Sequence, residues 1–263
     1  ILIVVPTNFI RNILDTLAPF LNPSSVIINA GKGIETDSLC TIREIFKQTL
    51  PSTCCFATLS GPTFATEVAR GEPSAIVVAS ETDNISHRIQ SIFSNPSLKV
   101  FTSDDPIGVE IGGALKNIIA ITTGISDGLK IGHNARAAII TRGLVEITRI
   151  GTALGAKPET FSGLSGLGDL VLTCTGEFSR NRQFGIRVGQ GEKPHEVTND
   201  MKVAVEGVLT LKSAYALKSK LNIQASIIEE TYKIIYETKS PHQALKDLMQ
   251  IKTTSEFIGV KGM

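Results

Sequence analysis

Ile1-Leu2-Ile3-Val4-Val5-Pro6 opens the chain, and this stretch decides how we interpret its first part. Five apolar residues, four of them β-branched, run without interruption up to the proline. Such a run is typical of a strand that is buried on both faces of a parallel sheet. No methionine or turn comes before it. We therefore expect the chain to begin in the middle of a fold, with further segments of the same sheet upstream.

The residues after this strand alternate between helical and extended patterns. The patterns predict helices at 8–20, 38–50, 62–70 and 84–93, and strands at 26–29, 54–59, 75–79 and 98–101. Strands that alternate with helices of this length indicate βαβ units, in which helices cover the faces of a mainly parallel sheet. Ligands of such sheets bind at the carboxyl ends of the strands.

The strand pattern stops near Thr-Ser-Asp-Asp-Pro at 102–106, and only helical spacing follows. Apolar residues three and four positions apart predict helices at 107–125, 135–154, 182–189, 208–221, 227–236 and 243–249. The sequence therefore predicts the α/β class, with a parallel-sheet domain at 1–104 and an all-α domain at 105–263. Small-molecule sites favour the cleft between two such domains.

Composition excludes several classes of partner. The 26 Lys and Arg residues balance 25 Asp and Glu residues, a net charge of +1, so neither nucleic acid nor a membrane surface is an expected partner. No apolar run reaches the ~20 residues of a membrane-spanning helix, so no membrane insertion is expected. The four cysteines lack the two-residue spacing of metal and redox sites, which favours a reduced cytoplasmic protein without a bound metal.

A single lysine, Lys116, stands in the middle of the apolar segment 111–126. Lysine is seldom buried unless it is paired or functional, and burial lowers its pKa toward the range of a general acid or base. Gly112 and Gly113, about one turn earlier, leave room for a ligand to approach the helix. The alternative is a lysine whose head reaches solvent, with glycines that serve helix packing.

The segment Ser179-Arg180-Asn181-Arg182 has the composition of an anion site. A serine at a helix N-cap, free backbone donors and a guanidinium all suit phosphate. A capped surface helix with solvated arginines is the alternative. Asp169, in the apolar stretch 165–174, needs a partner if it is buried, or it caps the segment that follows.

Two more loops follow predicted strands, at Asn29-Ala-Gly-Lys-Gly33 and Ser60-Gly-Pro-Thr-Phe-Ala65. Both lie where a parallel sheet places its ligand loops, although each is also an ordinary strand-to-helix turn. The four histidines are scattered without ligand spacing, and we assign no catalytic role to any of them: His87, His133, His195 and His242.

Taken together, these motifs resemble those of the bacterial-type NAD(P)-dependent sn-glycerol-3-phosphate dehydrogenases. The resemblance rests on their order and spacing, and it spans nearly the whole chain through five segments: 60–65, 113–117, 165–174, 179–182 and 205–207. It implies that the first domain is the C-terminal portion of a Rossmann-type dinucleotide-binding domain. It also implies reversible reduction of dihydroxyacetone phosphate by NAD(P)H, which forms sn-glycerol 3-phosphate for glycerophospholipid biosynthesis.

The resemblance assigns roles to individual positions. Lys116 matches the catalytic lysine, which protonates the carbonyl oxygen during reduction. The other matching positions contact substrate, cofactor or both. The substrate positions are Lys32, Gly61, Thr63, Lys116, Asn117, Asp169, Thr173, Ser179, Arg180 and Asn181. The cofactor positions are Lys32, Ala65, Arg180, Ala204 and Glu206.

The chain departs from the family's pattern at its front. The family begins with a glycine-rich turn that binds the cofactor pyrophosphate, and no G-x-G-x-x-G occurs in these 263 residues. At ~30 residues per βαβ unit, roughly two units are expected upstream. Two alternatives stay open: a non-catalytic remnant that binds a phosphorylated metabolite, and a related two-domain hydroxyacid dehydrogenase. A homodimer is a further possibility.

Overall fold

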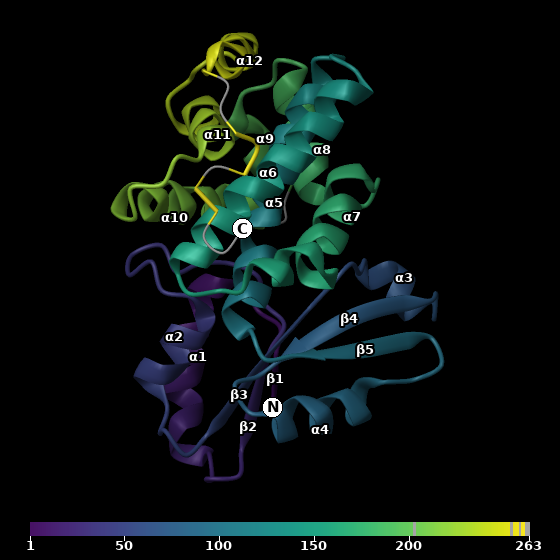
Figure 1. Cartoon of the computed structure of the whole chain (residues 1–263), viewed down its shortest axis with the longest axis vertical. Coiled ribbons are helices and arrows are strands. Elements are labelled where there is room, and N and C mark those ends of the chain that lie inside the picture. Colours follow the sequence, from purple (N-terminus) through teal and green to yellow (C-terminus); the bar gives the residue numbers. More distant parts are fainter. Residues whose placement is uncertain (202–203, 253–254, 258, 261–263) are drawn as a thin grey trace.

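The computed structural model describes residues 1–201, 204–252, 255–257 and 259–260. A five-stranded sheet and its flanking helices form one part of the molecule, and a bundle of helices forms the other (Figure 1). The last strand ends at Ser103 and the long helix α5 begins at Pro106. The predicted fold class, an α/β sheet domain followed by a helical domain, is confirmed.

Strand β1 (Leu2–Ile3) lies at one edge of the sheet, and this corrects our interpretation of the opening stretch. We expected a strand buried on both faces, but Ile1, Leu2 and Val4 are 52%, 46% and 64% exposed, and only Ile3 is buried. The run pairs on one side only, with β2 (Val26–Asn29). The apolar residues of this run are typical of a strand inside a sheet. In the described structure, however, no strand pairs with its other edge, and one of its two faces is exposed.

The sheet is mainly parallel, as predicted, and it contains one antiparallel pair of strands. β1, β2 and β3 (Cys55–Ser60) are parallel to one another, and β4 (Ser74–Ala79) is parallel to β5 (Leu98–Ser103). However, β4 runs antiparallel to β3. The β3–β4 connection contains only the five-residue helix α3 (Ala65–Ala69), which buries no residue and does not carry the chain across a sheet face as a parallel crossover requires.

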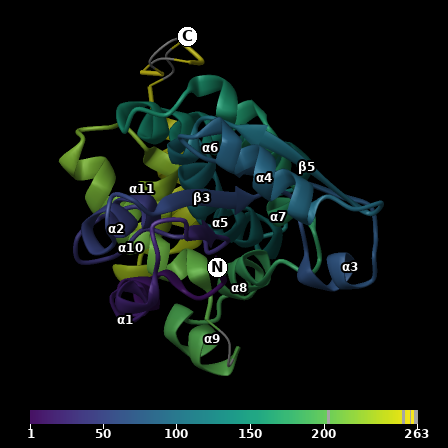
Figure 2. The ribbon, with the colours of Figure 1, turned by 90° about the horizontal axis from the view of Figure 1, so that it is seen from below.

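Helices cover both faces of this sheet. Alternate residues of a strand point to opposite faces, and β2 shows this directly. Ile27 packs in a cluster with residues of α1 (Thr7–Leu17) and α2 (Ile42–Thr49), while Ile28 packs in a cluster with Ile89 of α4 (Asp83–Phe93). Figure 2 shows α2 and α4 on the two sides of β3. A short 3₁₀ turn, Ala18–Phe20, extends α1.

Helix α5 (Pro106–Gly128) forms the centre of the helical part, because almost all of its side chains are buried. It contacts the strands β3 and β4 as well as most other helices, so it joins the two parts. The helices around it are α6 (His133–Ala153), α7 (Asp169–Thr175), α8 (Arg180–Gly189), α9 (Pro194–Asp200), α10 (Glu206–Lys220), α11 (Ser226–Tyr236) and α12 (Pro241–Gln250), with a 3₁₀ turn at Pro158–Ser162 and a π-turn at Leu164–Gly168.

Among the described residues, no helix combines the length and apolar character needed to cross a membrane. The sequence patterns predicted all the longer helices, and they missed α7, α9 and the turns between residues 158 and 168.

Candidate active site

Lys116 lies in the middle of α5, where the helix faces the sheet part, and its side chain is 7% exposed. Its Nζ donates hydrogen bonds to Asp169 Oδ1 at 2.5 Å and to Thr173 Oγ1 at 2.6 Å. Burial and the nearby charge of Lys32 lower the pKa of Lys116, the Asp169 carboxylate opposes both effects, and the net result is a pKa of about 8. An amine with this pKa exchanges protons readily near neutral pH.

Asp169 is completely buried at the start of α7 and accepts from two lysines. Its Oδ2 accepts from Lys32 Nζ at 2.6 Å, while its Oδ1 accepts from Lys116. Lys32 comes from the loop after β2, so the carboxylate connects a loop of the sheet part with two helices of the helical part. The sequence predicted that a buried Asp169 would need a partner, and the structure confirms this.

Two buried donors beside this cluster have no hydrogen-bond partner among the described residues. They are the hydroxyl of Ser60 and the Nδ2 of Asn117. Gly113 lies between them: a Cβ on it would be 2.9 Å from Ser60 Oγ, and Asn117 is four residues further along the same helix face. Buried donors are normally paired, so these two groups indicate a place for a polar ligand.

A second chain of contacts leads from Asn117 to α8 and α10. Asn181 Nδ2 donates to Asn117 Oδ1 at 2.9 Å, and Asn181 Oδ1 accepts from the backbone N–H of Gly207 at 2.9 Å. Glu206, which precedes Gly207, is the first residue of α10 and is half-buried. The structure therefore brings three predicted positions together: Asn117, Asn181 and Glu206.

The start of α8 has the features of an anion site. Ser179 is the N-cap and accepts from the backbone N–H of Arg182 at 3.3 Å, as its position in the motif predicted. Arg180 is exposed, and its guanidinium makes no hydrogen bond or ion pair with another described residue. A free guanidinium and an uncrowded helix N-terminus are both available to a phosphate.

The sheet part contributes the loop after β3. Gly61 has φ +149, and a Cβ on it would be 2.8 Å from the Ile76 Cα, so no other residue fits there without displacement of β4. Thr63 is half-buried and its hydroxyl donates to the Gly61 carbonyl at 3.4 Å. A Cβ on Gly168 would be 3.5 Å from Pro62 Cγ, so this loop packs close to the turn that precedes Asp169.

The structure does not bring every predicted position to Lys116. Ala65 is exposed at the first residue of α3, and Ala204 is exposed just before α10. Neither has a described contact with the lysine cluster. Conversely, Ser60 and Gly207 belong to the site although they were not among the predicted site residues. Their places inside the motifs 60–65 and 205–207 were the available signal.

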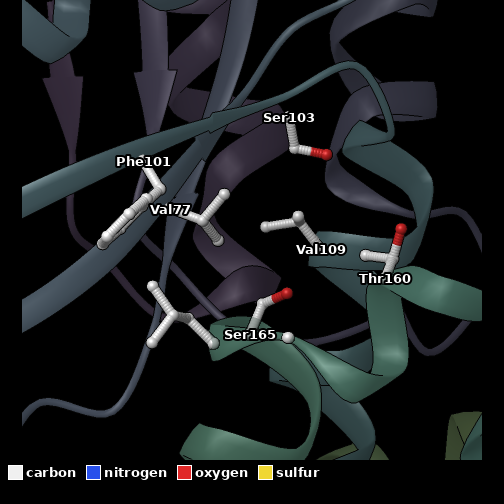
Figure 3. A pocket seen from close by; sticks show the side chains of 8 residues that line it. Val77, Phe101, Ser103, Val109, Thr160 and Ser165 are labelled. Atoms are coloured by element: carbon white, nitrogen blue, oxygen red, sulfur yellow. The ribbon is translucent and has the colours of Figure 1, made fainter.

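Two pockets in the surface are separate from this cluster. Figure 3 shows one of about 330 Å³ between β4, β5 and the N-terminal part of α5, with Val77, Phe101, Val109 and Ser165 in its lining. Another, of about 490 Å³, lies between α2 and the residues after β4. Lys116 lines neither one. The site is assigned by its chemistry, because among the described residues the buried amine, its carboxylate partner and the unpaired donors occur together only at the cluster.

The fold and the site define a class of α/β protein in which a sheet part is joined to a helical part and a lysine and a carboxylate are buried at their junction. The same fold occurs in 2-dehydropantoate 2-reductase from Geobacter metallireducens GS-15, with a TM-score of 0.53 over 90% of this chain and 76% of that chain, at 11% identity. Family models for the N-terminus and the C-terminus of NAD-dependent glycerol-3-phosphate dehydrogenase match residues 1–86 and 105–246. The chain belongs to the NAD-dependent glycerol-3-phosphate dehydrogenase family.

Individual relatives agree with this membership. The chain is 49% identical over 251 residues to glycerol-3-phosphate dehydrogenase [NAD(P)+] of Geobacter sulfurreducens, which covers 95% of this chain and 75% of that protein. The crystal structure of glycerol-3-phosphate dehydrogenase from Coxiella burnetii matches with a TM-score of 0.91 at 39% identity. That match covers 95% of this chain and 76% of that one.

Proposed function

We propose that this protein reversibly reduces dihydroxyacetone phosphate to sn-glycerol 3-phosphate with NAD(P)H, a step that serves glycerophospholipid biosynthesis. The observation that carries the proposal is Lys116, a buried amine with a pKa near 8 whose Nζ lies 2.5 Å from the Asp169 carboxylate. Reduction of a ketone needs a proton at the developing alkoxide, and Lys116 supplies it. In the reverse direction the neutral amine accepts the proton of the hydroxyl.

Three neighbours control this proton. Asp169 and Thr173 hold Nζ by hydrogen bonds of 2.5 and 2.6 Å, which fix the direction in which the amine points. Lys32, on the other oxygen of the carboxylate, adds a positive charge close to the reacting oxygen. Preorganised positive charge stabilises the negative charge that develops on that oxygen.

We assign the substrate phosphate to the first turn of α8. Arg180 supplies a free guanidinium, Ser179 caps the helix, and Asn181 connects this turn to Asn117 beside Lys116. The loop with Gly61 and Thr63 closes the substrate region from the sheet side. Residues 105–263 then act as the substrate domain, and residues 1–104 as the part that contributes to cofactor binding.

The residues present fit the reactive end of the cofactor, because the buried Ser60 hydroxyl and Asn117 amide are donors without partners. We assign cofactor contacts to Lys32, Ala65, Arg180, Ala204 and Glu206. When bound, NAD(P)H supplies the hydride. We further propose that the enzyme is cytoplasmic and assembles as a homodimer.

A steady-state assay tests the function. Purified protein should consume NADH or NADPH in the presence of dihydroxyacetone phosphate and should regenerate it from sn-glycerol 3-phosphate. Absence of cofactor oxidation, together with calorimetric binding of glycerol 3-phosphate, would instead support a non-catalytic phosphate-binding protein.

A further inference from the structure

Arg182 lies two residues after Arg180 in the first turn of α8, but it points to a different side of the helix, because successive helical residues are rotated by about 100°. Its side chain is 15% exposed and is held by Asp127 in the last turn of α5. Asp127 Oδ2 accepts from Arg182 Nε at 2.9 Å and lies 2.7 Å from Nη2. Arg182 therefore anchors the turn that carries Arg180.

The backbones of α5 and α8 touch next to this anchor. A Cβ on Gly124 of α5 would lie 2.1 Å from the Arg182 carbonyl oxygen. A Cβ on Gly185 of α8 would lie 2.1 Å from the Ile121 carbonyl oxygen. With no side chains between the two backbones, the helices approach closely but glycine alone does not fix how α8 is rotated. Apolar packing of Phe184 and Val188 and polar contacts at the start of α8 supply this orientation.

Two such contacts join the residues that directly follow Arg180 to α5: Asn181 binds Asn117, and Arg182 binds Asp127. Both partners stand on α5, the helix that carries Lys116. Along an α-helix, Asp127 lies ~16 Å from Lys116, too far to take part in the chemistry. Its contact can act only through the orientation of α8.

We propose that Asp127 and Arg182 are positioning residues that hold the start of α8 so that Arg180 meets the substrate phosphate while the carbonyl lies at Lys116. This inference rests on the proposed function. It assigns a role in substrate binding to two residues that do not themselves contact the substrate. Correct placement is a large part of the contribution of a substrate clamp, since a displacement of about 1 Å costs up to ~100-fold in rate.

The chain offers a matched control in Arg136 of α6. Arg136 binds the other oxygen of the same carboxylate, with Nε and Nη2 at 2.7 and 2.5 Å from Asp127 Oδ1. Arg182→Leu and Arg136→Leu each remove one of the two arginine partners of Asp127 and leave the other. Only Arg182→Leu removes a contact of α8. Both variants should therefore lose similar thermal stability, while only Arg182→Leu should bind sn-glycerol 3-phosphate more weakly.

The experiment is calorimetric titration of the chain and both variants with sn-glycerol 3-phosphate, accompanied by thermal unfolding. We expect Arg182→Leu to weaken binding by about 10-fold to 100-fold, and Arg136→Leu to leave the dissociation constant unchanged. Equal weakening in the two variants, or none in Arg182→Leu, would overturn the inference. If the parent chain itself does not bind, the proposed function fails instead.

If Arg182→Leu does not fold, the pair Arg182→Lys and Arg136→Lys replaces it, because lysine keeps the charge but cannot form the two-pronged contact. The expected order is the same, with Arg182→Lys the weaker binder. Equal binding by the two lysine variants would contradict the positioning role.

Discussion

A buried carboxylate, Asp169, and a partly buried one, Asp127, each lie between two cations, yet the partners differ. Asp169 is held between two lysines, with N–O distances of 2.6 and 2.5 Å. Asp127 is held between two arginines, with N–O distances of 2.5 and 2.7 Å. The first group lies where the sheet part meets the helical part, and the second lies at the far end of α5. Similar geometry thus serves two different purposes.

The difference lies in which cation can lose its proton. Burial and a second lysine lower the pKa of Lys116 to about 8, so this cluster can exchange a proton under ordinary conditions. A guanidinium stays protonated throughout this range. The arginine cluster can therefore only hold helices together, while the lysine cluster can carry out chemistry. The predictions below are ordered by the size of the effect that each one should have.

Substitution of Lys116 should have the largest effect. Lys116→Ala removes the proton donor, and a general acid contributes about 10²-fold to 10⁴-fold to turnover. Steady-state kinetics should show this fall in kcat with a modest change in KM. Lys116→Arg should be almost as damaging, since arginine does not release its proton. A large rise in KM with unchanged kcat would contradict the catalytic assignment.

Asp127→Asn should act on stability, in addition to its effect on the position of α8. It leaves two arginines without their carboxylate, and loss of one partner of a buried ion pair costs about 3 kcal/mol or more. Urea denaturation should show this decrease in the free energy of unfolding. A variant as stable as the parent would contradict the conclusion that the ion pairs of Asp127 hold the helices together.

Arg180→Ala should weaken binding of the phosphorylated substrate. A hydrogen bond to a charged group contributes about 1.5–3 kcal/mol, so KM for dihydroxyacetone phosphate should rise by roughly one to two orders of magnitude. Unphosphorylated dihydroxyacetone is the control, and its slow reduction should hardly change. Equal losses for both substrates would mean that Arg180 supports the fold or the cofactor.

Glu110, whose effect should appear in the pH dependence of stability and not in turnover, extends the comparison to a buried carboxylate with no ion-pair partner among the described residues. Its Oε2 accepts from the Arg43 backbone at 3.2 Å, and burial raises its pKa to about 8. The folded protein therefore keeps this proton up to about pH 8, whereas the unfolded chain loses it near its ordinary value of 4.5. Stability should fall as pH rises between these values.

Glu110→Gln should flatten that part of the profile, because glutamine stays neutral in both states. Urea denaturation at several pH values would measure the slope in parent and variant. Glu146, whose pKa burial raises to about 7, is present in both proteins and leaves a residual slope. Identical slopes in the two proteins would show that Glu110 is ionised when folded.

The sequence predicted much of the fold because periodicity is a local property. The strand at 26–29 and the long helices followed directly from their apolar spacing. Pairing is not local, and here the patterns failed: they gave neither the edge position of β1 nor the antiparallel β3–β4 contact. Helix α7, only seven residues long and entered through a π-turn, has too few residues to show a period.

The site was predictable for a different reason. Lys116 and Ser179 stood out by their residue types and positions, but the contacts between Asp169 and the two lysines span 53 and 137 residues. No spacing rule reaches that far. Only the resemblance to a known family placed those residues in one set, and the structure shows which of them meet.

The most direct test of the account is the pH dependence of kcat/KM in both directions for the parent enzyme. Oxidation of sn-glycerol 3-phosphate needs the neutral amine of Lys116, so its rate should rise with pH and level off above about 8. Reduction of dihydroxyacetone phosphate needs the protonated amine and should decline over the same range. An oxidation rate that continues to rise up to the ordinary lysine pKa of 10.5 would contradict the central claim that burial beside Lys32 makes Lys116 the proton carrier.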